Sequence, residues 1–130
     1  MKSVISIIVL VAVALAAFYL ITTKKNSKSM TSTESFKQQY KETPGIVIDV
    51  RTQGEYDNGH LKITDQHHDI LNGDFAQQLD SLDKNETYYL YCRSGNRSGK
   101  ATQMMKDKGF EKVYNIGGYQ DLVNSGLESE

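Results

Sequence analysis

The only cysteine of this 130-residue chain opens a segment whose residue types suit sulfur chemistry, Cys92-Arg93-Ser94-Gly95-Asn96-Arg97-Ser98. A thiolate is a stronger nucleophile than a thiol, and cationic groups or a helix N-terminus lower a cysteine pKa. Arg93 and Arg97 supply cations that could also clamp an oxyanion, and Gly95 permits a tight backbone turn. A cysteine at the end of an apolar strand is often an inert core residue. The six residues that follow favour a nucleophile instead, with residues 93–98 as a substrate-binding loop.

The position of this segment between two regular elements strengthens the prediction. Residues 88–92 have the composition of a central strand, and Ala101, Met104 and Met105 mark the buried face of a helix that follows. A tight turn into a helix directs several backbone N–H groups at one point and so creates an anion site. In open parallel sheets, ligands bind at the carboxyl ends of strands. We therefore expect the cysteine at such an end.

The rest of residues 31–130 alternates strand and helix. Strands are predicted at 46–50, 88–92 and 113–116. Helices are predicted from a capping box at 31–34 to Pro44, from a second box at 52–55 to Asn58, over 74–82, from the cysteine loop to Gly109, and over 118–126. The run 46–50 is wholly apolar apart from Asp49, as in strands that are covered on both faces. This pattern predicts an α/β domain with a central, mainly parallel sheet flanked by helices.

Two further polar groups lie near the expected sheet edge. Arg51 follows the first strand, where it could add positive potential to the site or form a structural ion pair with Glu55 or another acid. His67 and His68 are adjacent and have no carboxylate at ligand spacing, so no metal site is predicted. One cysteine also excludes a disulfide framework and a multi-cysteine zinc site.

Residues 1–30 differ in kind from the rest. Residues 4–21 form an uncharged, largely apolar run of eighteen residues, about the minimum for a transmembrane helix. A signal peptide cleaved after 14–16 is the alternative, although the apolar run continues past that point. Residues 24–30 indicate a short polar linker. We expect residues 1–30 to be an anchor or signal peptide with its linker, and residues 31–130 to be the functional domain.

Charge is distributed unevenly between these two parts. Residues 1–30 hold four lysines and no acid, whereas residues 31–130 hold 11 basic and 16 acidic residues. An acidic domain lacks the electrostatic footprint of nucleic-acid binding, and no nucleic-acid partner is expected. Three of the lysines follow the apolar run, which favours a single-pass membrane protein with a cytoplasmic domain. Export after signal-peptide cleavage would place the domain in the periplasm instead.

The cysteine loop resembles the active-site loop of the rhodanese family of sulfurtransferases. The resemblance extends over about residues 33–127. The stretches 48–51, 55–56 and 59–61 resemble the family's first signature, and 113–118 its closing one. Two features depart from the pattern: residues 62–68 replace a proline-glycine-alanine stretch, and Leu122 stands where tryptophan is usual.

The resemblance implies a rhodanese-like fold and a two-step sulfur transfer. The Cys92 thiolate would take the outer sulfur of a donor such as thiosulfate, and the resulting persulfide would pass it to cyanide or a thiol. Arg93 and Arg97 would hold the donor or the leaving sulfite. No metal or organic cofactor is implied, and a protein acceptor is not identified.

Two other functions are compatible with the same loop. Dual-specificity phosphatases of the cell-cycle type have a related fold, but they place five residues between cysteine and arginine, where Cys92 and Arg97 are separated by four. No aspartate general acid is recognisable, which also counts against an arsenate reductase. A non-catalytic binding module of the rhodanese type is the other alternative, and the presence of Cys92 and both loop arginines weakens it.

Overall fold

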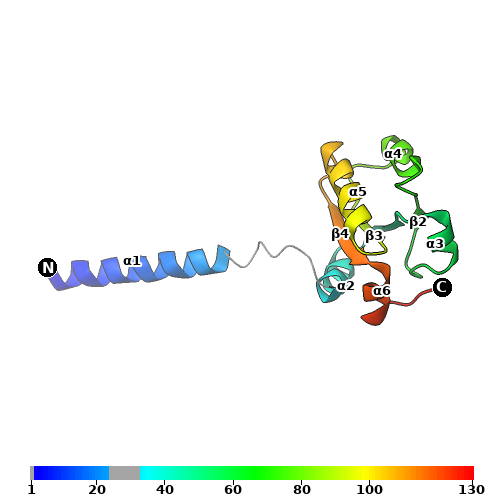
Figure 1. The fold of residues 1–130 in the computed structure, drawn as a ribbon. Coiled ribbons are helices and arrows are strands. Elements are labelled where there is room, and N and C mark those ends of the chain that lie inside the picture. Colours follow the sequence, from blue (N-terminus) through cyan, green and yellow to red (C-terminus); the bar gives the residue numbers. More distant parts are fainter. Residues whose placement is uncertain (1, 24–32) are drawn as a thin grey trace.

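The computed structural model describes residues 2–23 and 33–130 (Figure 1). Four strands form one sheet: β1 (Ile46–Asp49), β2 (Gln66–His67), β3 (Tyr88–Cys92) and β4 (Val113–Gly118). Their order is β2-β1-β3-β4, and all three neighbouring pairs are parallel. The prediction of a parallel α/β sheet is confirmed, and β3 is an inner strand with the predicted bounds.

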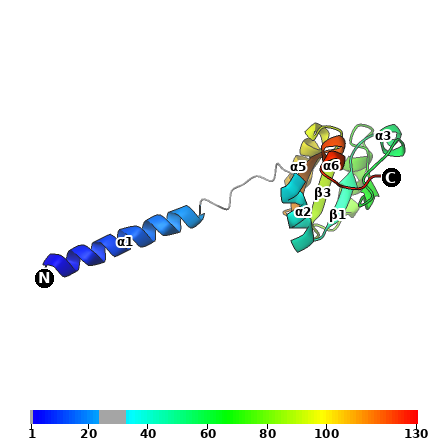
Figure 2. The same cartoon turned by 90° about the horizontal axis from the view of Figure 1, so that it is seen from below.

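Helices cover both faces of the sheet. α2 (Thr33–Glu42) and α6 (Tyr119–Asn124) lie side by side on one face, as Figure 2 shows. α4 (Asp74–Gln78), the 3-10 turn η2 (Leu79–Ser81) and α5 (Asn96–Asp107) pack on the other face. α3 (Gln53–Asp57) follows β1. The two faces arise because successive strand residues alternate: Tyr89 and Tyr91 face α2 and α6, whereas Leu90 and Cys92 face α5.

Local signals in the sequence correspond to the observed helix ends. Thr52 caps α3, and its side chain and that of Glu55 form the predicted reciprocal capping box. Gly109, next to the Lys108 C-cap of α5, has a φ of 96°, the left-handed backbone that ends many helices. The first residues of the other predicted capping box, Thr31 and Ser32, lie outside the described residues, as does the predicted linker at 24–30.

Two elements differ from the sequence-based expectation. β2 was not predicted, and it lies in the segment 62–68 that departs from the rhodanese pattern. Its two half-buried residues pair with Ile48 and Asp49 of β1. The predicted helix over 74–82 is an α-helix only to Gln78 and narrows into η2 from Leu79. Leu122, the other departure from the pattern, is the buried residue of α6 and packs into the core on the face of the sheet that α2 and α6 cover.

The N-terminal apolar run lies in a helix of its own, α1 (Lys2–Thr23). Its described side chains, over residues 6–17, are exposed. In the part of the chain that the structure describes, no helix meets the combined requirement of length and apolar character for crossing a bilayer.

Candidate active site

Cys92 is the last residue of β3 and is fully buried, so its sulfur lies at the carboxyl end of an inner strand. The chain turns at once into α5, which begins at Asn96. Gly95 makes this turn possible with a φ of 92°, a region that residues with a Cβ rarely occupy. The strand, turn and helix predicted around the cysteine are thus all present.

Hydrogen bonds converge on the Cys92 sulfur. The Gly95 N–H donates to Sγ at 3.0 Å, and the Ser98 hydroxyl lies 3.3 Å from Sγ. Burial opposes ionisation, but the Ser98 hydroxyl and the N–H groups of Ser98, Ser94 and Gly95 outweigh it, so the pKa of the Cys92 thiol is lowered. The direction agrees with the sequence-based prediction. Hydrogen bonds lead this effect, rather than the guanidinium groups that the sequence suggested.

Asn115 on β4 holds the cysteine loop and was not singled out from the sequence. Its Nδ2 donates to the Gly95 carbonyl at 2.9 Å, and its Oδ1 accepts from the Ser98 hydroxyl at 2.7 Å and from the Gly117 N–H at 3.1 Å. One amide group therefore fixes both residues that contact the sulfur. Its signals in the sequence were its place in the closing signature at 113–118 and its polar side chain in an otherwise apolar strand.

Gly118 forms the surface on which the loop rests. It pairs with Cys92 in the sheet, and a Cβ at this position would lie 2.6 Å from the Arg93 carbonyl oxygen and 3.2 Å from the Ser94 Cα. Both neighbours are backbone atoms with little freedom to move. Gly118, the second glycine of the closing signature, therefore has a steric role beneath the loop.

Arg97 is bound to a carboxylate. Its Nη1 and Nη2 donate to Oε1 and Oε2 of Glu55 at 2.7 and 2.8 Å, a bidentate ion pair between α5 and α3. Arg97 is the strongest influence on Glu55, and the pKa of that carboxyl falls to about 2. The ion pair also raises the pKa of Arg97, to which the charge of Cys92 contributes. Contact between Arg97 and a donor remains a prediction.

Arg51 forms the structural ion pair that its position suggested, with Asp49. Its Nη2 lies 2.7 Å from Asp49 Oδ2 and also donates to the Gly59 carbonyl. The Arg51 side chain is 4% exposed, Asp49 is fully buried, and the Tyr119 ring lies 4.4 Å from the guanidinium carbon. These contacts give Arg51 a structural role, and a part for it in substrate binding, through positive potential at the site, stays a prediction.

Three other loop residues are exposed, and the two adjacent histidines contact neighbouring polar groups. Arg93, Ser94 and Asn96 are exposed. His67 Nε2 lies 2.7 Å from the Arg51 carbonyl, while His68 lies near Gln66 and Asp74. Across residues 2–23 and 33–130, no group of three or more His, Cys, Asp or Glu side chains could hold a metal ion.

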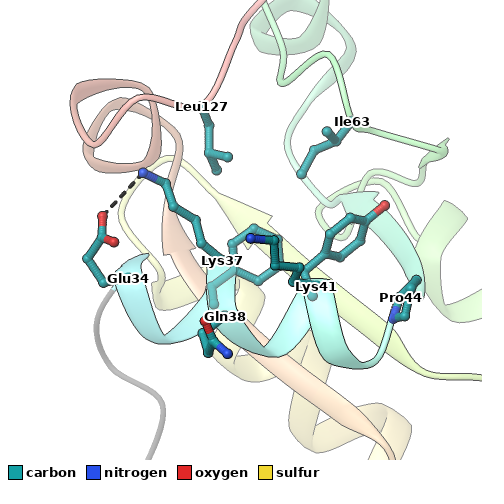
Figure 3. Close-up of a pocket in the computed structure, with 9 residues that line it drawn as sticks. Glu34, Lys37, Gln38, Lys41, Pro44, Ile63 and Leu127 are labelled. Carbon is teal, nitrogen blue, oxygen red and sulfur yellow. Dashed lines mark hydrogen bonds and ion pairs between the residues drawn. The ribbon is translucent and has the colours of Figure 1, made fainter.

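The structure also has an open groove away from the cysteine (Figure 3). It has a volume of about 570 Å³ and lies between α2 and the side chains of Ile63 and Leu127. Lys37, at its rim, pairs with Glu34 at 3.2 Å. Its lining includes neither Cys92 nor any residue of the loop, so the groove takes no part in the sulfur site.

The part of the chain that forms the sheet and its helices is similar to known proteins. The rhodanese-like domain family matches residues 32–125. YrkF of Bacillus subtilis, whose name assigns it provisionally to sulfur carriage, is 36% identical over 86 residues. The thiosulfate sulfurtransferase PspE of Escherichia coli is 29% identical over 81 residues, which are 58% of this chain and 72% of PspE. The match to YrkF covers 65% of this chain but only 45% of YrkF.

A solved structure of a rhodanese-like domain is also similar to this chain in fold. The crystal structure of a rhodanese-like domain protein from Staphylococcus aureus is 27% identical, with a TM-score of 0.61. The alignment covers 78% of this chain and 97% of that one. The two proteins therefore share the rhodanese-like fold.

Proposed function

This chain belongs to the rhodanese-like domain family, and we propose that it is a sulfurtransferase that carries sulfane sulfur as a persulfide on Cys92. One observation carries the proposal. The Cys92 sulfur ends an inner strand and receives the Gly95 N–H at 3.0 Å, beside the Ser98 hydroxyl. These donors stabilise an anionic sulfur, and a lowered pKa supplies the nucleophile. The names of YrkF and PspE support the same chemistry.

The first step forms the persulfide. The Cys92 thiolate attacks the outer sulfur of thiosulfate, a Cys92 S–S bond forms, and the S–S bond of thiosulfate breaks. Sulfite leaves with the bonding electron pair, and the negative charge remains on the outer sulfur of the persulfide. No proton is transferred, so this step requires no general base.

The second step unloads the sulfur. Cyanide or a thiolate attacks the outer sulfur of the persulfide, and the Cys92 S–S bond breaks. The electron pair returns to Cys92, whose thiolate is again stabilised by the Gly95 N–H. Dividing one transfer into two displacements at the same sulfur is the advantage of covalent catalysis.

Intact mass spectrometry tests this proposal. Residues 1–130 mixed with thiosulfate should gain one sulfur atom, about 32 Da, and lose it when cyanide is added. Cys92→Ser should gain nothing under the same conditions. An unmodified wild-type protein whose thiol reacts freely with an alkylating reagent would favour the binding-module alternative.

We also propose that residues 4–21 attach the protein to a membrane with the domain on the cytoplasmic side. The support is the uncharged run and the lysines that follow it. Sedimentation with membranes, resistance to carbonate extraction and an uncleaved N-terminus would agree with an anchor. A soluble product that begins after residue 16 would instead indicate a cleaved signal peptide.

A further inference from the structure

The two arginines of the cysteine loop have different electrostatic environments. Arg93 is exposed at the start of the loop. Arg97 is 19% exposed, and both of its terminal nitrogens bind the carboxylate of Glu55. Glu55 is 42 residues away in the sequence and is fixed at the N-terminus of α3 by the Thr52 capping box. The fold therefore places a negative charge beside one of the two loop cations.

This pairing alters the charge that an incoming donor meets. Without Glu55, the loop would present two positive charges from Arg93 and Arg97. With Glu55, one of them is compensated, and the Cys92 thiolate opposes the other. A donor with two negative charges is then attracted to the site much less strongly than the loop sequence suggests. For a donor with one negative charge, the loss of attraction is half as large, because Coulomb energy is proportional to the donor charge. Arg97 is close enough to Cys92 for their charges to interact.

We propose that Glu55 is a specificity-determining residue that disfavours dianionic sulfur donors, such as thiosulfate, relative to donors with a single negative charge. This inference rests on the proposed sulfur transfer. The donors with a single negative charge include organic thiosulfonates and persulfide anions. Their reacting sulfur is sulfane sulfur, as in thiosulfate, but their total negative charge is lower. The Glu55 carboxylate stays ionised throughout the neutral range, because its pKa is about 2, so the preference should not vary between pH 6 and 8.

Two donors that differ by one charge provide the test. Thiosulfate transfers sulfur to the Cys92 thiolate and releases sulfite. Benzenethiosulfonate, a monoanion, transfers its outer sulfur in the same way and releases benzenesulfinate with the bonding electron pair. Both leave the same Cys92 persulfide. The ratio of the two kcat/KM values therefore isolates the effect of donor charge from the reactivity of the cysteine.

Glu55→Gln is the central variant. Glutamine retains the length of the side chain and serves at the third position of a capping box, so α3 keeps its start. Removing the negative charge should raise kcat/KM for thiosulfate about tenfold and for benzenethiosulfonate about threefold, since Coulomb energy is proportional to the donor charge. Glu111→Gln makes the same change of net charge at an exposed position before β4 and should alter neither value.

Arg97→Gln and the double variant complete a cycle. The 55–97 pair has no net charge in the wild type, one positive charge in Glu55→Gln, one negative charge in Arg97→Gln and none in the double variant. The preference for thiosulfate should be highest in Glu55→Gln and lowest in Arg97→Gln. The wild type and the double variant should lie between these two and close to each other. This ordering remains testable if one single variant fails to fold.

Each outcome has a distinct meaning. Equal changes for both donors in Glu55→Gln, or a double variant as poor with thiosulfate as Arg97→Gln, would overturn the inference and show that Arg97 itself grips the donor. If neither donor loads sulfur onto wild-type Cys92, the proposed function is wrong, and the inference falls with it. If the wild type forms the persulfide but Glu55→Gln has the same ratio of the two kcat/KM values as the wild type, the inference is overturned and the proposed function is not.

Discussion

Ser98 contacts Cys92 from the first turn of α5, and its Oγ lies 3.3 Å from the cysteine Sγ. The same oxygen lies 2.7 Å from Asn115 Oδ1. A hydroxyl has one hydrogen, so Ser98 can donate to only one of these acceptors at a time. Because an ionised acceptor attracts a hydrogen more strongly than a neutral one, we expect the hydroxyl to turn from Asn115 to the sulfur when Cys92 is ionised.

Removing this hydroxyl should make the cysteine a weaker acid. In Ser98→Ala the thiolate loses a donor, so the pKa of Cys92 rises and less of it is ionised at pH 7. Alkylation by iodoacetamide at pH 7 should slow several-fold, and the midpoint of its pH profile should move upward. Ser81→Ala, an exposed change in η2, is the control. An unchanged midpoint would show that the backbone N–H groups suffice.

Gly118→Ala should distort the loop. The added Cβ would meet the Arg93 carbonyl oxygen at 2.6 Å, so the backbone of the loop must shift away from β4. We expect a loss of about 1–3 kcal/mol in the free energy of unfolding and at least a tenfold slower persulfide formation. Urea denaturation and stopped-flow mass analysis measure the two effects.

The matched control for that change is Gly54→Ala. No atom lies within 4 Å of a Cβ at this position in α3, and alanine is favoured over glycine in a helix by about 1 kcal/mol. Stability should stay the same or rise, with normal activity. A Gly118→Ala protein that behaves like this control would refute the steric role of Gly118.

The Asp49–Arg51 pair should matter for stability more than for chemistry. Asp49→Asn leaves a buried guanidinium without its counter-charge, which should lower the free energy of unfolding by about 3–5 kcal/mol. Glu34→Gln breaks the exposed pair with Lys37 and should cost at most about 0.5 kcal/mol. Urea denaturation of both variants checks this contrast. Equal losses would mean that the Asp49–Arg51 pair contributes no more than a surface pair.

Acid unfolding should reveal the Glu55–Arg97 pair. The folded-state pKa of Glu55 is lowered to about 2 from an ordinary 4.5, so its stabilisation is present above pH 4.5 and disappears as the pH falls toward 2. Because the pair is partly exposed, we expect the contribution to be about 1–2 kcal/mol.

Comparison with Glu55→Gln isolates that contribution. The wild type should be the more stable protein at pH 6, and the difference should vanish near pH 2 when both are unfolded with urea. Glu111→Gln should track the wild type throughout. A difference between wild type and Glu55→Gln that persists at pH 2 would have to come from contacts other than the charge.

Local patterns predicted those parts of the fold that depend on neighbouring residues. The apolar run of β3, the capping box of α3 and the glycine after α5 each involve residues within a few positions of one another. β2 had no such signal, because two residues are too few to show alternation and its strand conformation depends on pairing with β1.

The site was predictable in its nucleophile and loop but not in their supports. Glu55 and Arg97 are 42 residues apart, and no local pattern favours this pairing over that of Glu55 with Arg51. Asn115 reaches the loop beside an irregularity in the pairing of β3 with β4, at which Leu90 faces Asn115 but Tyr91 faces Gly117. That register exists only once the sheet has formed.

The N–H of Gly95 at the Cys92 sulfur has a consequence for how this protein can change over generations. A main-chain donor is supplied by every residue type except proline, so this hydrogen bond does not depend on the side chains at 94 and 96, which are exposed. These two positions can therefore change without removing the donor at the reactive sulfur, whereas a change at Arg93 would also alter the charge of the loop. Sequence drift and retained reactivity are thereby compatible within the same short loop.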